Sequence, residues 1–327
     1  MRIMTGLDNW YSKTSVGSVA LGFFDGVHVG HQSIIMTTVQ EAQRQALPSA
    51  VLSFEPHPLA VINPDLAPKL ITSLSKKTEL IAQLGVDFLL VLPFTLTFAD
   101  TDAFTFARLV LTDVLKTKHV TVGYNYSFGH KRRGTPEKLT AWGRELGFGV
   151  TIVPPVTCDG EVVSSSRIRQ LISQGEVAKA ATILGRCPTI SGQVVRGAGR
   201  GHCLGFPTAN ITLNEELVLP RFGVYAVRSQ YQDKHLYGVA NIGLVPTYGY
   251  HTARLEVNFF EFGEDLYGQY LCIELISFLR PERKFVSADA LKDQMEVDKQ
   301  QAIRIFTYTD RKVDRNCLAS VYNRGAL

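Results

Sequence analysis

Apolar runs and segments of helical periodicity alternate along the first half of the chain. SVALGF at Ser18–Phe23, SAVLSF at Ser49–Phe54 and HVTVGY at His119–Tyr124 are apolar runs of strand length, and helix-like segments lie between them. One of these helices is predicted to start at SLSKK, Ser73–Lys77. Strands that alternate with helices indicate crossover connections and a parallel sheet. Sheets of this kind bind ligands beyond the carboxyl ends of their strands.

The pattern changes after Gly185. Short strand-like runs separated by glycine-rich turns follow, and they predict a small antiparallel β-barrel. The segment Ser287–Phe306 is expected to close the barrel as a helix, with Ser287 as its N-cap and Asp289 in its first turn. The sequence therefore predicts an α/β domain at residues 1–185, a β-barrel domain at 186–310 and a C-terminal tail at 311–327.

The composition of the 327 residues fits two globular domains. No apolar run approaches the roughly 20 residues of a membrane-spanning helix, and the N-terminal segment has no apolar signal core. The five cysteines are widely spread and form no C-x-x-C pair, so we expect a reducing, cytoplasmic location. The formal net charge of +4 suits anionic small molecules but is too small to indicate nucleic acid by itself.

Two histidines stand on the glycine-rich turn GFFDGVHVGH, Gly22–His31, where a predicted strand gives way to a helix. A helix N-terminus has unpaired N–H groups and a partial positive charge, so it binds phosphates well. His28 and His31 are three residues apart and can line one side of the first helical turn. Phosphate contact, capping or packing, and metal ligation are all open for this pair, although H-x-x-H without a third ligand is a weak zinc signal.

A second helix start of similar kind is SSSRIR, Ser164–Arg169, which follows the last predicted strand of the sheet. Its three hydroxyls can cap the helix, or they can bind a phosphate together with the guanidinium of Arg169. Taken alone, capping is the simpler interpretation. Two such helix starts in one parallel sheet favour a triphosphate site.

GFFDGVHVGHQ and VSSSRIR together resemble the paired H-x-G-H and I-S-S-T-x-x-R motifs of an adenylyltransferase family. FEPHP, LGVDFLLVLPF and GYNYSFGHKRRG narrow this resemblance to the FAD synthetase module of bacterial bifunctional riboflavin kinase/FAD synthetases, over about Gly17–Gly185. The resemblance implies a Rossmann-like nucleotidyltransferase sheet on which His28 and His31 contact the ATP phosphates and stabilise charge as pyrophosphate leaves. The implied contacts to ATP and its phosphates are Gly22, Phe24, Asp25, Gly30, Ser164, Ser166 and Arg169. The implied FMN contacts are Phe54, His57 and Asn125.

The segment GQVVRGAGRGHCLGFPTAN, Gly192–Asn210, is a second glycine-rich signal and lies within the predicted barrel. Glycines let backbone N–H groups turn toward a phosphate or a flat ring, although a tight barrel turn would need them as well. GFPTAN resembles the P-T-A-N motif of riboflavin kinases, and GVANIGLVPT, EDLYG and LRPERKF extend this resemblance over about Thr189–Ile305. The resemblance implies a nucleotide and flavin loop of Gly192, Gly197, Arg200, Gly205, Phe206, Pro207 and Asn241.

The riboflavin kinase resemblance also implies a magnesium site and a base. Thr208 and Asn210 offer a hydroxyl and an amide oxygen, which suit Mg²⁺ beside ATP phosphates. Glu256 in RLEVNFF would accept the proton of the riboflavin 5′-hydroxyl. Five positions depart from the common family patterns: Phe23 replaces asparagine, Ser166 threonine, His202 arginine, Asn258 histidine and Glu261 aspartate.

These resemblances lead to one functional prediction. The chain is expected to phosphorylate riboflavin to FMN and then to transfer AMP from ATP to FMN, which gives FAD and pyrophosphate. ATP, riboflavin, FMN, FAD and Mg²⁺ are the expected ligands, with no bound prosthetic group, nucleic acid, membrane or obligatory oligomer. Two alternatives stay open: an adenylyltransferase for another phosphorylated acceptor, such as phosphopantetheine, and a non-catalytic regulator that binds flavin or RNA.

Overall fold

The computed structural model describes residues 1–7, 10, 15–197, 206–247 and 250–322, with side chains described outside 245–252 and 309–322. The chain forms two compact units. One comprises Met1–Arg169 and Ile183–Gly185, and the other comprises Gln170–Thr182 and Arg186–Leu327. The segment Gln170–Thr182, which precedes the boundary expected from the sequence, groups with the barrel because Val177 lies in the barrel's apolar core.

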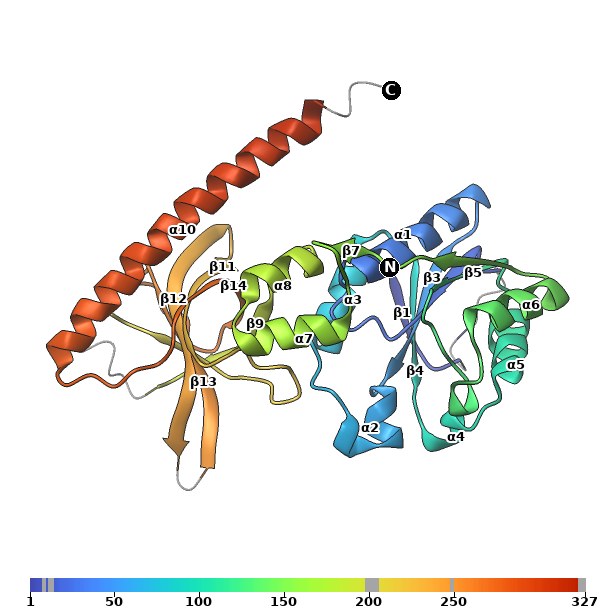
Figure 1. Ribbon diagram of the computed structural model, residues 1–327, viewed down its shortest axis with the longest axis horizontal. Helices are drawn as coiled ribbons and strands as arrows, with labels where there is room; N and C mark the ends of the chain where they lie inside the picture. The colour runs from blue at the N-terminus through green and yellow to red at the C-terminus, as the bar shows by residue number, and fades with distance from the viewer. Residues whose placement is uncertain (8–9, 11–14, 198–205, 248–249, 323–327) are drawn as a thin grey trace. The chain divides into compact units, whose positions relative to one another are not determined.

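Six parallel strands form the sheet of the first unit, in the order β1-β4-β3-β2-β5-β6 (Figure 1). Their bounds are β1 Arg2–Thr5, β2 Ser18–Leu21, β3 Ser49–Glu55, β4 Phe88–Pro93, β5 His119–Gly123 and β6 Gly149–Val153. The predicted parallel α/β sheet is confirmed, and β1 is an edge strand that was not predicted from the sequence. The strand order reverses between β2 and β5, because β3 and β4 continue on one side of β2, and β5 and β6 on the other. Open α/β sheets bind their ligands at such switch points.

Helices connect these strands. Their bounds are α1 Val29–Arg44, α2 Pro58–Ile62, α3 Leu74–Gln83, α4 Leu96–Ala99, α5 Ala103–Phe106, α6 Pro136–Leu146, α7 Ser165–Gln174 and α8 Val177–Leu184. The predicted start of α3 is confirmed, because Ser73 Oγ accepts a hydrogen bond from the Lys76 N–H at 3.2 Å. α5 is followed directly by a π-helix, Ala107–Val114, and the Asp102 carboxylate caps the start of α5.

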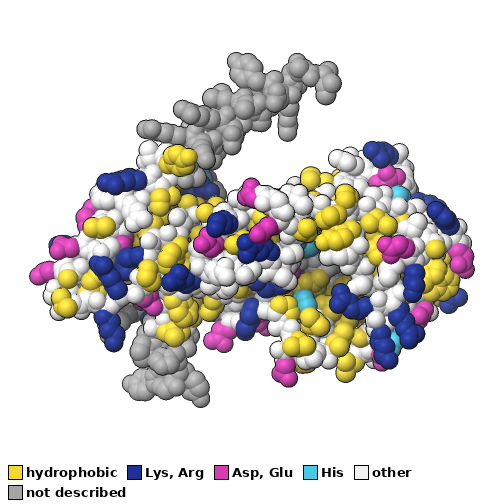
Figure 2. Space-filling model, viewed as in Figure 1, with side chains coloured by type: hydrophobic (Ala, Val, Ile, Leu, Met, Phe, Trp, Pro, Cys, Tyr) yellow, Lys and Arg dark blue, Asp and Glu magenta, His cyan; other side chains and the backbone are white. Residues whose placement is uncertain are grey.

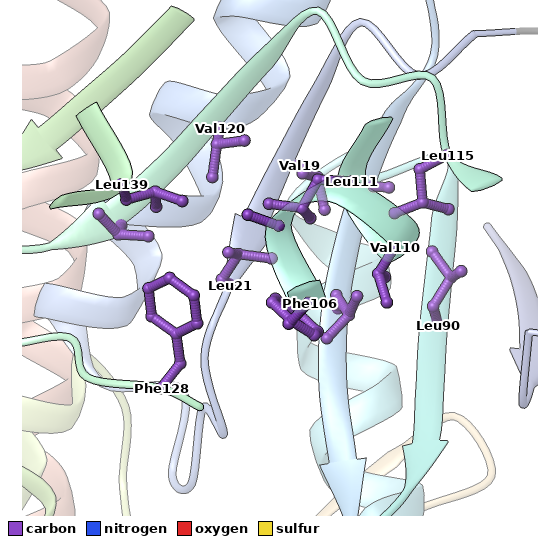
Figure 3. Close-up of a cluster of buried hydrophobic side chains, with 14 of the residues drawn as sticks. Val19, Leu21, Leu90, Phe106, Val110, Leu111, Leu115, Val120, Phe128 and Leu139 are labelled. Carbon is purple, nitrogen blue, oxygen red and sulfur yellow. The ribbon is translucent and has the colours of Figure 1, made fainter. Parts of the chain in front are cut away.

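Both faces of the sheet are covered, since successive side chains of a strand point to opposite faces. Leu21 of β2 packs with Phe106 and Leu111 of the α5 and π-helix segment (Figure 3). Ala20, its neighbour in β2, packs with Ile35 of α1 in a separate cluster. These five side chains are 3% exposed or less. Each large apolar side chain buried in this way stabilises the fold by about 1.5–3 kcal/mol. The strand ends are therefore the part of the sheet left for a ligand.

The second unit contains a closed antiparallel barrel with the strand order β10-β13-β12-β11-β14-β9. Its strands are β9 Thr189–Val195, β10 Ala209–Ile211, β11 Gly223–Tyr231, β12 Lys234–Thr247, β13 Tyr250–Phe259 and β14 Tyr270–Arg280. The barrel core includes the fully buried side chains of Tyr225, Leu255 and Val257. Gly192 of β9 lies so close to the Thr212 carbonyl that a Cβ would clash with it, so this glycine is required by the strand packing. The predicted small antiparallel barrel is confirmed.

The terminal helix α10, Ala288–Tyr322, follows the barrel (Figure 1). Ser287 Oγ accepts a hydrogen bond from a first-turn N–H at 3.1 Å, and Asp289 lies in this turn, as predicted. The helix continues well past Phe306, its predicted end, because the following sequence has no glycine or proline before Tyr322 that would end it. Within the described ranges, no helix is both long and apolar enough to cross a membrane.

Candidate active sites

The carboxyl ends of three neighbouring strands carry the predicted adenylyltransferase residues. β3, β2 and β5 are adjacent in the parallel sheet, so the segments that follow them lie at one edge. Gly22–His31 begins directly after β2, His57 comes shortly after β3, and Asn125 follows β5. The topology therefore brings together residues that are far apart in the sequence, at the switch point of the sheet.

His28 and His31 form a stacked pair at the start of α1. Their ring centroids are 3.5 Å apart, and the ring planes differ by 17°. His28 is the N-cap, and its Nδ1 accepts a hydrogen bond from the His31 N–H at 3.2 Å. Gly30 lies against the His28 ring. Capping and stacking are thus both present, at a helix N-terminus that can also receive a phosphate.

The environment of His31 favours its neutral form. Burial, the neighbouring His28 and the positive charge of Lys77 together lower the pKa of His31 well below its ordinary value of 6.5. The Phe24 ring packs edge-on against the His31 ring, with 5.3 Å between the centroids. His31 Nδ1 is buried and has no hydrogen-bond partner among the described residues. Because such a buried polar atom is costly, His31 has a group to offer to a ligand.

Gly22 and Phe24 shape the turn that leads to this pair. The Gly22 N–H donates to the Leu52 carbonyl at 3.2 Å, which extends the pairing between β2 and β3. The backbone of Phe24 is left-handed, with φ of 57°, and its side chain is buried. A Cβ at Gly22 would meet the Phe24 ring at 2.8 Å, so only glycine allows this ring to fold back under the turn.

Asp25, on the same turn, is buried and paired with Arg169. The Asp25 carboxylate lies 2.6 Å from Arg169 Nη2, and the two side chains are 3% and 16% exposed. Asp25 also accepts hydrogen bonds from the backbone N–H groups of Ile71 at 2.9 Å and Thr72 at 3.2 Å. Arg169 Nε donates to the Lys69 carbonyl at 2.7 Å. The Asp25 carboxylate thus holds the Arg169 guanidinium through an ion pair, and contact of either residue with ATP stays a prediction.

The three serines at the start of α7 have different environments. Ser164 Oγ accepts a hydrogen bond from the Arg167 N–H at 3.2 Å, so it caps the helix. Ser165 Oγ donates to the Asp25 carbonyl at 3.0 Å and ties the two motifs together. Ser166 is exposed. The hydroxyl of Ser166 is therefore the one on the open surface.

Lys77, predicted only as part of a helix start, reaches the same turn. Its side chain is 3% exposed, and its Nζ donates to the Phe23 carbonyl at 3.2 Å. The ammonium also lies 4.2 Å from the centroid of the Phe23 ring. The helical phase could have revealed it, because Lys77 stands three and four residues before the buried Leu80 and Ile81, on the apolar face of α3.

The three predicted FMN contacts differ in how far their side chains are exposed to solvent. Phe54 is 8% exposed and packs against two other phenylalanines, with centroid distances of 5.7 and 5.5 Å. His57 caps α2 through Nδ1, and its ring lies 4.5 Å from the Phe23 ring. Burial and the positive charge of Arg169 lower the pKa of His57. Asn125 is exposed. His57 and Asn125 therefore present polar atoms at the strand ends, whereas Phe54 mainly serves the core.

On the face shown in Figure 2, positive charge is not gathered into one broad surface. Acidic side chains are interspersed on this face among the lysines and arginines. This distribution agrees with the formal net charge of only +4. Beside the histidine turn, the nearby cations are Lys77 and Arg169.

In the barrel, three predicted kinase residues lie side by side on neighbouring strands. Glu256 of β13 is in register with Asn210 of β10 on one side and with Asn241 of β12 on the other. The two neighbours of Glu256 along β13 are fully buried, so strand alternation points Glu256 away from the barrel core. Thr208 stands directly before β10 and is half-buried.

The surroundings of Asn210 suit a hard cation. Asn210 is 5% exposed, and its Oδ1 accepts a hydrogen bond from Arg254 Nη1 at 3.5 Å. Gly197 lies against the same amide. With Thr208, the two predicted donors are both oxygens, the kind of ligand that Mg²⁺ prefers. The described ranges contain no group of three or more His, Cys, Asp or Glu residues that could hold a metal, so an ion here would rely on ATP phosphates and water for further ligands.

Other predicted loop residues are placed as follows. Pro207 is exposed and Phe206 is half-buried. The Pro207 carbonyl accepts a hydrogen bond from Asn258 Nδ2 at 2.8 Å, so this departure from the family pattern joins β13 to the GFPTAN segment. Asn241 Nδ2 donates to a Glu282 carboxylate oxygen at 3.1 Å. Arg200, His202 and Gly205 lie outside the described residues.

Two family models match the chain, one for each half. The FAD synthetase model matches residues 11–167, and the riboflavin kinase model matches residues 184–306. The first range holds the histidine turn and the second holds the barrel. A solved structure titled macrolide-efflux protein, from Streptococcus pneumoniae, superimposes with a TM-score of 0.83 at 30% identity and covers 92% of this chain and 98% of its own. Its title names transport, so this comparison contributes the shared fold.

Curated relatives from several bacteria match nearly the whole chain. The protein from Listeria monocytogenes, named bifunctional riboflavin kinase/FMN adenylyltransferase, is 39% identical over 91% of this chain and 95% of the relative. Two proteins with the same name are similarly close: that of Bacillus subtilis is 38% identical over 88% and 92%, and that of Escherichia coli K12 is 37% identical over 94% and 99%. Both enzyme modules are therefore present in one polypeptide, and the chain belongs to the family of bifunctional riboflavin kinase/FMN adenylyltransferases.

Proposed function

We propose that this chain converts riboflavin to FMN and FMN to FAD, with one ATP used in each step. Family membership supports both activities. The observation that supports the assignment of residues is the register of Glu256 between Asn210 and Asn241, because residues in register on adjacent strands lie side by side, as a base beside oxygen ligands would require. Phosphoryl transfer belongs to the barrel unit and adenylyl transfer to the unit with the parallel sheet, with the functional boundary near Gly185.

In the kinase step, the Glu256 carboxylate accepts the proton of the riboflavin 5′-hydroxyl. The hydroxyl oxygen forms a bond to the γ-phosphorus of ATP, while the bond from this phosphorus to the bridging oxygen of ADP breaks. Thr208 Oγ1 and Asn210 Oδ1 would hold Mg²⁺, which when bound neutralises phosphate charge. The Arg254 guanidinium, 3.5 Å from Asn210 Oδ1, adds positive charge beside this site.

In the adenylylation step, a phosphate oxygen of FMN forms a bond to the α-phosphorus of ATP, and the bond to pyrophosphate breaks. The phosphate nucleophile is already ionised, so the protein mainly positions the reactants and stabilises charge. His28, His31 and the N-terminus of α1 would receive the departing pyrophosphate. Gly22, Phe24, Asp25, Gly30, Ser164, Ser166 and Arg169 complete the proposed ATP site, and Phe54, His57 and Asn125 the proposed FMN site.

The proposed cellular location is the cytoplasm. Cys158, Cys187 and Cys272 are free thiols in the described part of the chain, which suits a reducing compartment. ATP, riboflavin, FMN and FAD are the proposed ligands.

The test is to incubate the protein with riboflavin, ATP and Mg²⁺ and to separate the flavins by chromatography. We expect FMN to appear first and FAD to follow, and we expect a chelator of divalent cations to stop both steps. FMN without FAD would contradict the adenylyltransferase assignment, and neither product would contradict both. Phosphopantetheine supplied in place of FMN serves as the control for acceptor specificity.

A further inference from the structure

Lys77 is a buried cation that the reactions above do not use. Its side chain is 3% exposed, although lysine is among the residues least often buried. Burial lowers the pKa of Lys77, while the nearby carboxylates of Glu55 and Asp25 raise it. Burying the Lys77 ammonium has a large desolvation cost, so we expect this buried charge to have a specific role.

The contacts of Lys77 converge on one residue of the histidine turn. Lys77 Nζ donates to the Phe23 carbonyl at 3.2 Å and to Ser53 Oγ at 3.3 Å. Ser53 Oγ donates to the same carbonyl at 3.0 Å. The Phe23 ring lies between the Lys77 ammonium, at 4.2 Å, and the His57 ring, at 4.5 Å. Both the backbone and the side chain of Phe23 are therefore held from α3 and β3.

Phe23 is the residue at which the chain leaves β2 and enters the turn. The next residue, Phe24, has a left-handed backbone, and its ring packs against His31. A shift of the Phe23 carbonyl would therefore be passed through Phe24 to the position of the His31 ring. The charge of Lys77 also reaches the catalytic surroundings, since it lowers the pKa of both His31 and His57.

We propose that Lys77 is a positioning residue for adenylyl transfer, whose ammonium holds the Phe23 carbonyl and so fixes the Gly22–His31 turn in the geometry that receives the ATP phosphates. This inference rests on the adenylyltransferase function proposed above. It assigns to α3 a part in the reaction.

If Lys77 served only the fold, replacing it would lower the stability of the protein rather than its catalytic rate. The hydrogen-bond partners of its ammonium in the described residues are neutral oxygens. Replacing Lys77 with methionine removes the desolvation cost of the ammonium, and the Phe23 carbonyl keeps its hydrogen bond from Ser53 Oγ, so the fold should lose little stability. If Lys77 serves the reaction, Lys77→Met should keep the fold and lose the activity.

The experiment compares Lys77→Met with Lys76→Met in the full-length protein. Lys76 is the adjacent lysine and pairs with Glu79 at the surface, so its replacement is the matched control. We expect Lys77→Met to lower kcat/KM for ATP in FMN adenylylation by about 10–100-fold, since an error of 1 Å in positioning costs about 100-fold. The KM for ATP should rise at least about threefold, which loss of folded molecules alone cannot produce. Riboflavin phosphorylation by the same molecules should stay unchanged.

The outcomes separate the inference from the proposed function. If the unaltered protein makes no FAD from supplied FMN, both fail. If it does and Lys77→Met matches it, only the role of Lys77 is overturned. Should Lys77→Met also melt at a lower temperature, Lys77→Arg decides, because arginine keeps a cation that can donate to the Phe23 carbonyl. Adenylylation by Lys77→Arg at least about fivefold faster than by Lys77→Met supports the inference, and equal rates overturn it.

Discussion

Replacement of Arg169 by methionine tests whether this arginine mainly stabilises the fold or mainly contacts the substrate. Arg169 Nη2 lies 2.6 Å from the Asp25 carboxylate, and both side chains are largely buried. Methionine keeps much of the apolar stem and removes the guanidinium. Asp25 would then retain its hydrogen bonds from the Ile71 and Thr72 N–H groups, at 2.9 and 3.2 Å, but would lose its charged partner.

The magnitude follows from the burial of the remaining carboxylate. Removing one partner of a buried ion pair typically costs about 3–5 kcal/mol in the free energy of unfolding. The backbone donors that stay with Asp25 favour the lower end, about 3 kcal/mol. For a unit of roughly 150–250 residues, each kcal/mol shifts the melting temperature by about 2–4 °C. We therefore expect Arg169→Met to lower the melting temperature of the first unit by about 6–12 °C.

The assay is differential scanning calorimetry of the full-length protein with a matched control and a double variant. Arg167→Met is the control, because the Arg167–Glu161 pair, at 2.8 Å, is more exposed and should contribute less than about 1 kcal/mol. Adding Asp25→Asn to Arg169→Met should recover at least about 1 kcal/mol, because the unpaired charge is then removed. An Arg169→Met protein that melts within about 2 °C of the unaltered protein yet makes no FAD would refute this reasoning, and Arg169 would then act on the substrate alone.

Three further outcomes are expected. Glu256→Gln should slow riboflavin phosphorylation by about 10²–10⁴-fold and leave adenylylation of supplied FMN intact, as measured by flavin chromatography. Because the folded state holds the pKa of His31 below its ordinary value, the stability from its neutral form is complete above about pH 6.5 and is lost as the pH falls below it. His31→Gln should therefore flatten the loss of stability between pH 6.5 and 5.5 by up to about 1.4 kcal/mol, measured by urea unfolding. Gly129→Ala should cost more than about 2 kcal/mol, because φ is 71° and the new Cβ would lie 2.5 Å from Ala103 Cα, whereas Gly85→Ala, with open space around it, should cost about 1 kcal/mol by the same measurement.

Local patterns in the sequence were sufficient to predict most strands of the parallel sheet. The central strands are apolar runs between helices of clear periodicity, so their type and parallel direction follow from burial on both faces. β1 was missed because Arg2–Thr5 begins and ends with a polar residue and gains its place through pairing with Phe88–Val91 of β4. The length of α10 was underestimated because its apolar pattern ends at Phe306, although nothing in the following residues stops a helix.

In the candidate site, too, contacts between residues close in the sequence could be predicted, and contacts between distant residues could not. The spacing of His28 and His31 placed both rings on one helical turn, and the structure has them stacked. The pairing of Asp25 with Arg169 joins residues 144 positions apart, and no spacing rule reports on such a contact. Their motifs alone predicted that both residues contact phosphate. Whether a charged residue contacts a ligand or pairs with another residue of the chain depends on the packing, which the motifs do not describe.

The two cations beside the histidine turn differ in what balances them. Arg169 is matched by the Asp25 carboxylate, so at a distance the charges of this pair largely cancel. The ammonium of Lys77 is hydrogen-bonded to the neutral oxygens of Phe23 and Ser53, and the carboxylates of Glu55 and Asp25 act on it without a hydrogen bond among the described contacts. The positive charge of Lys77, together with burial, favours neutral His31, because a second cation there would be repelled. Stabilisation of a departing pyrophosphate at this turn would therefore come mainly from the N–H groups of α1, rather than from an imidazole already protonated before ATP binds.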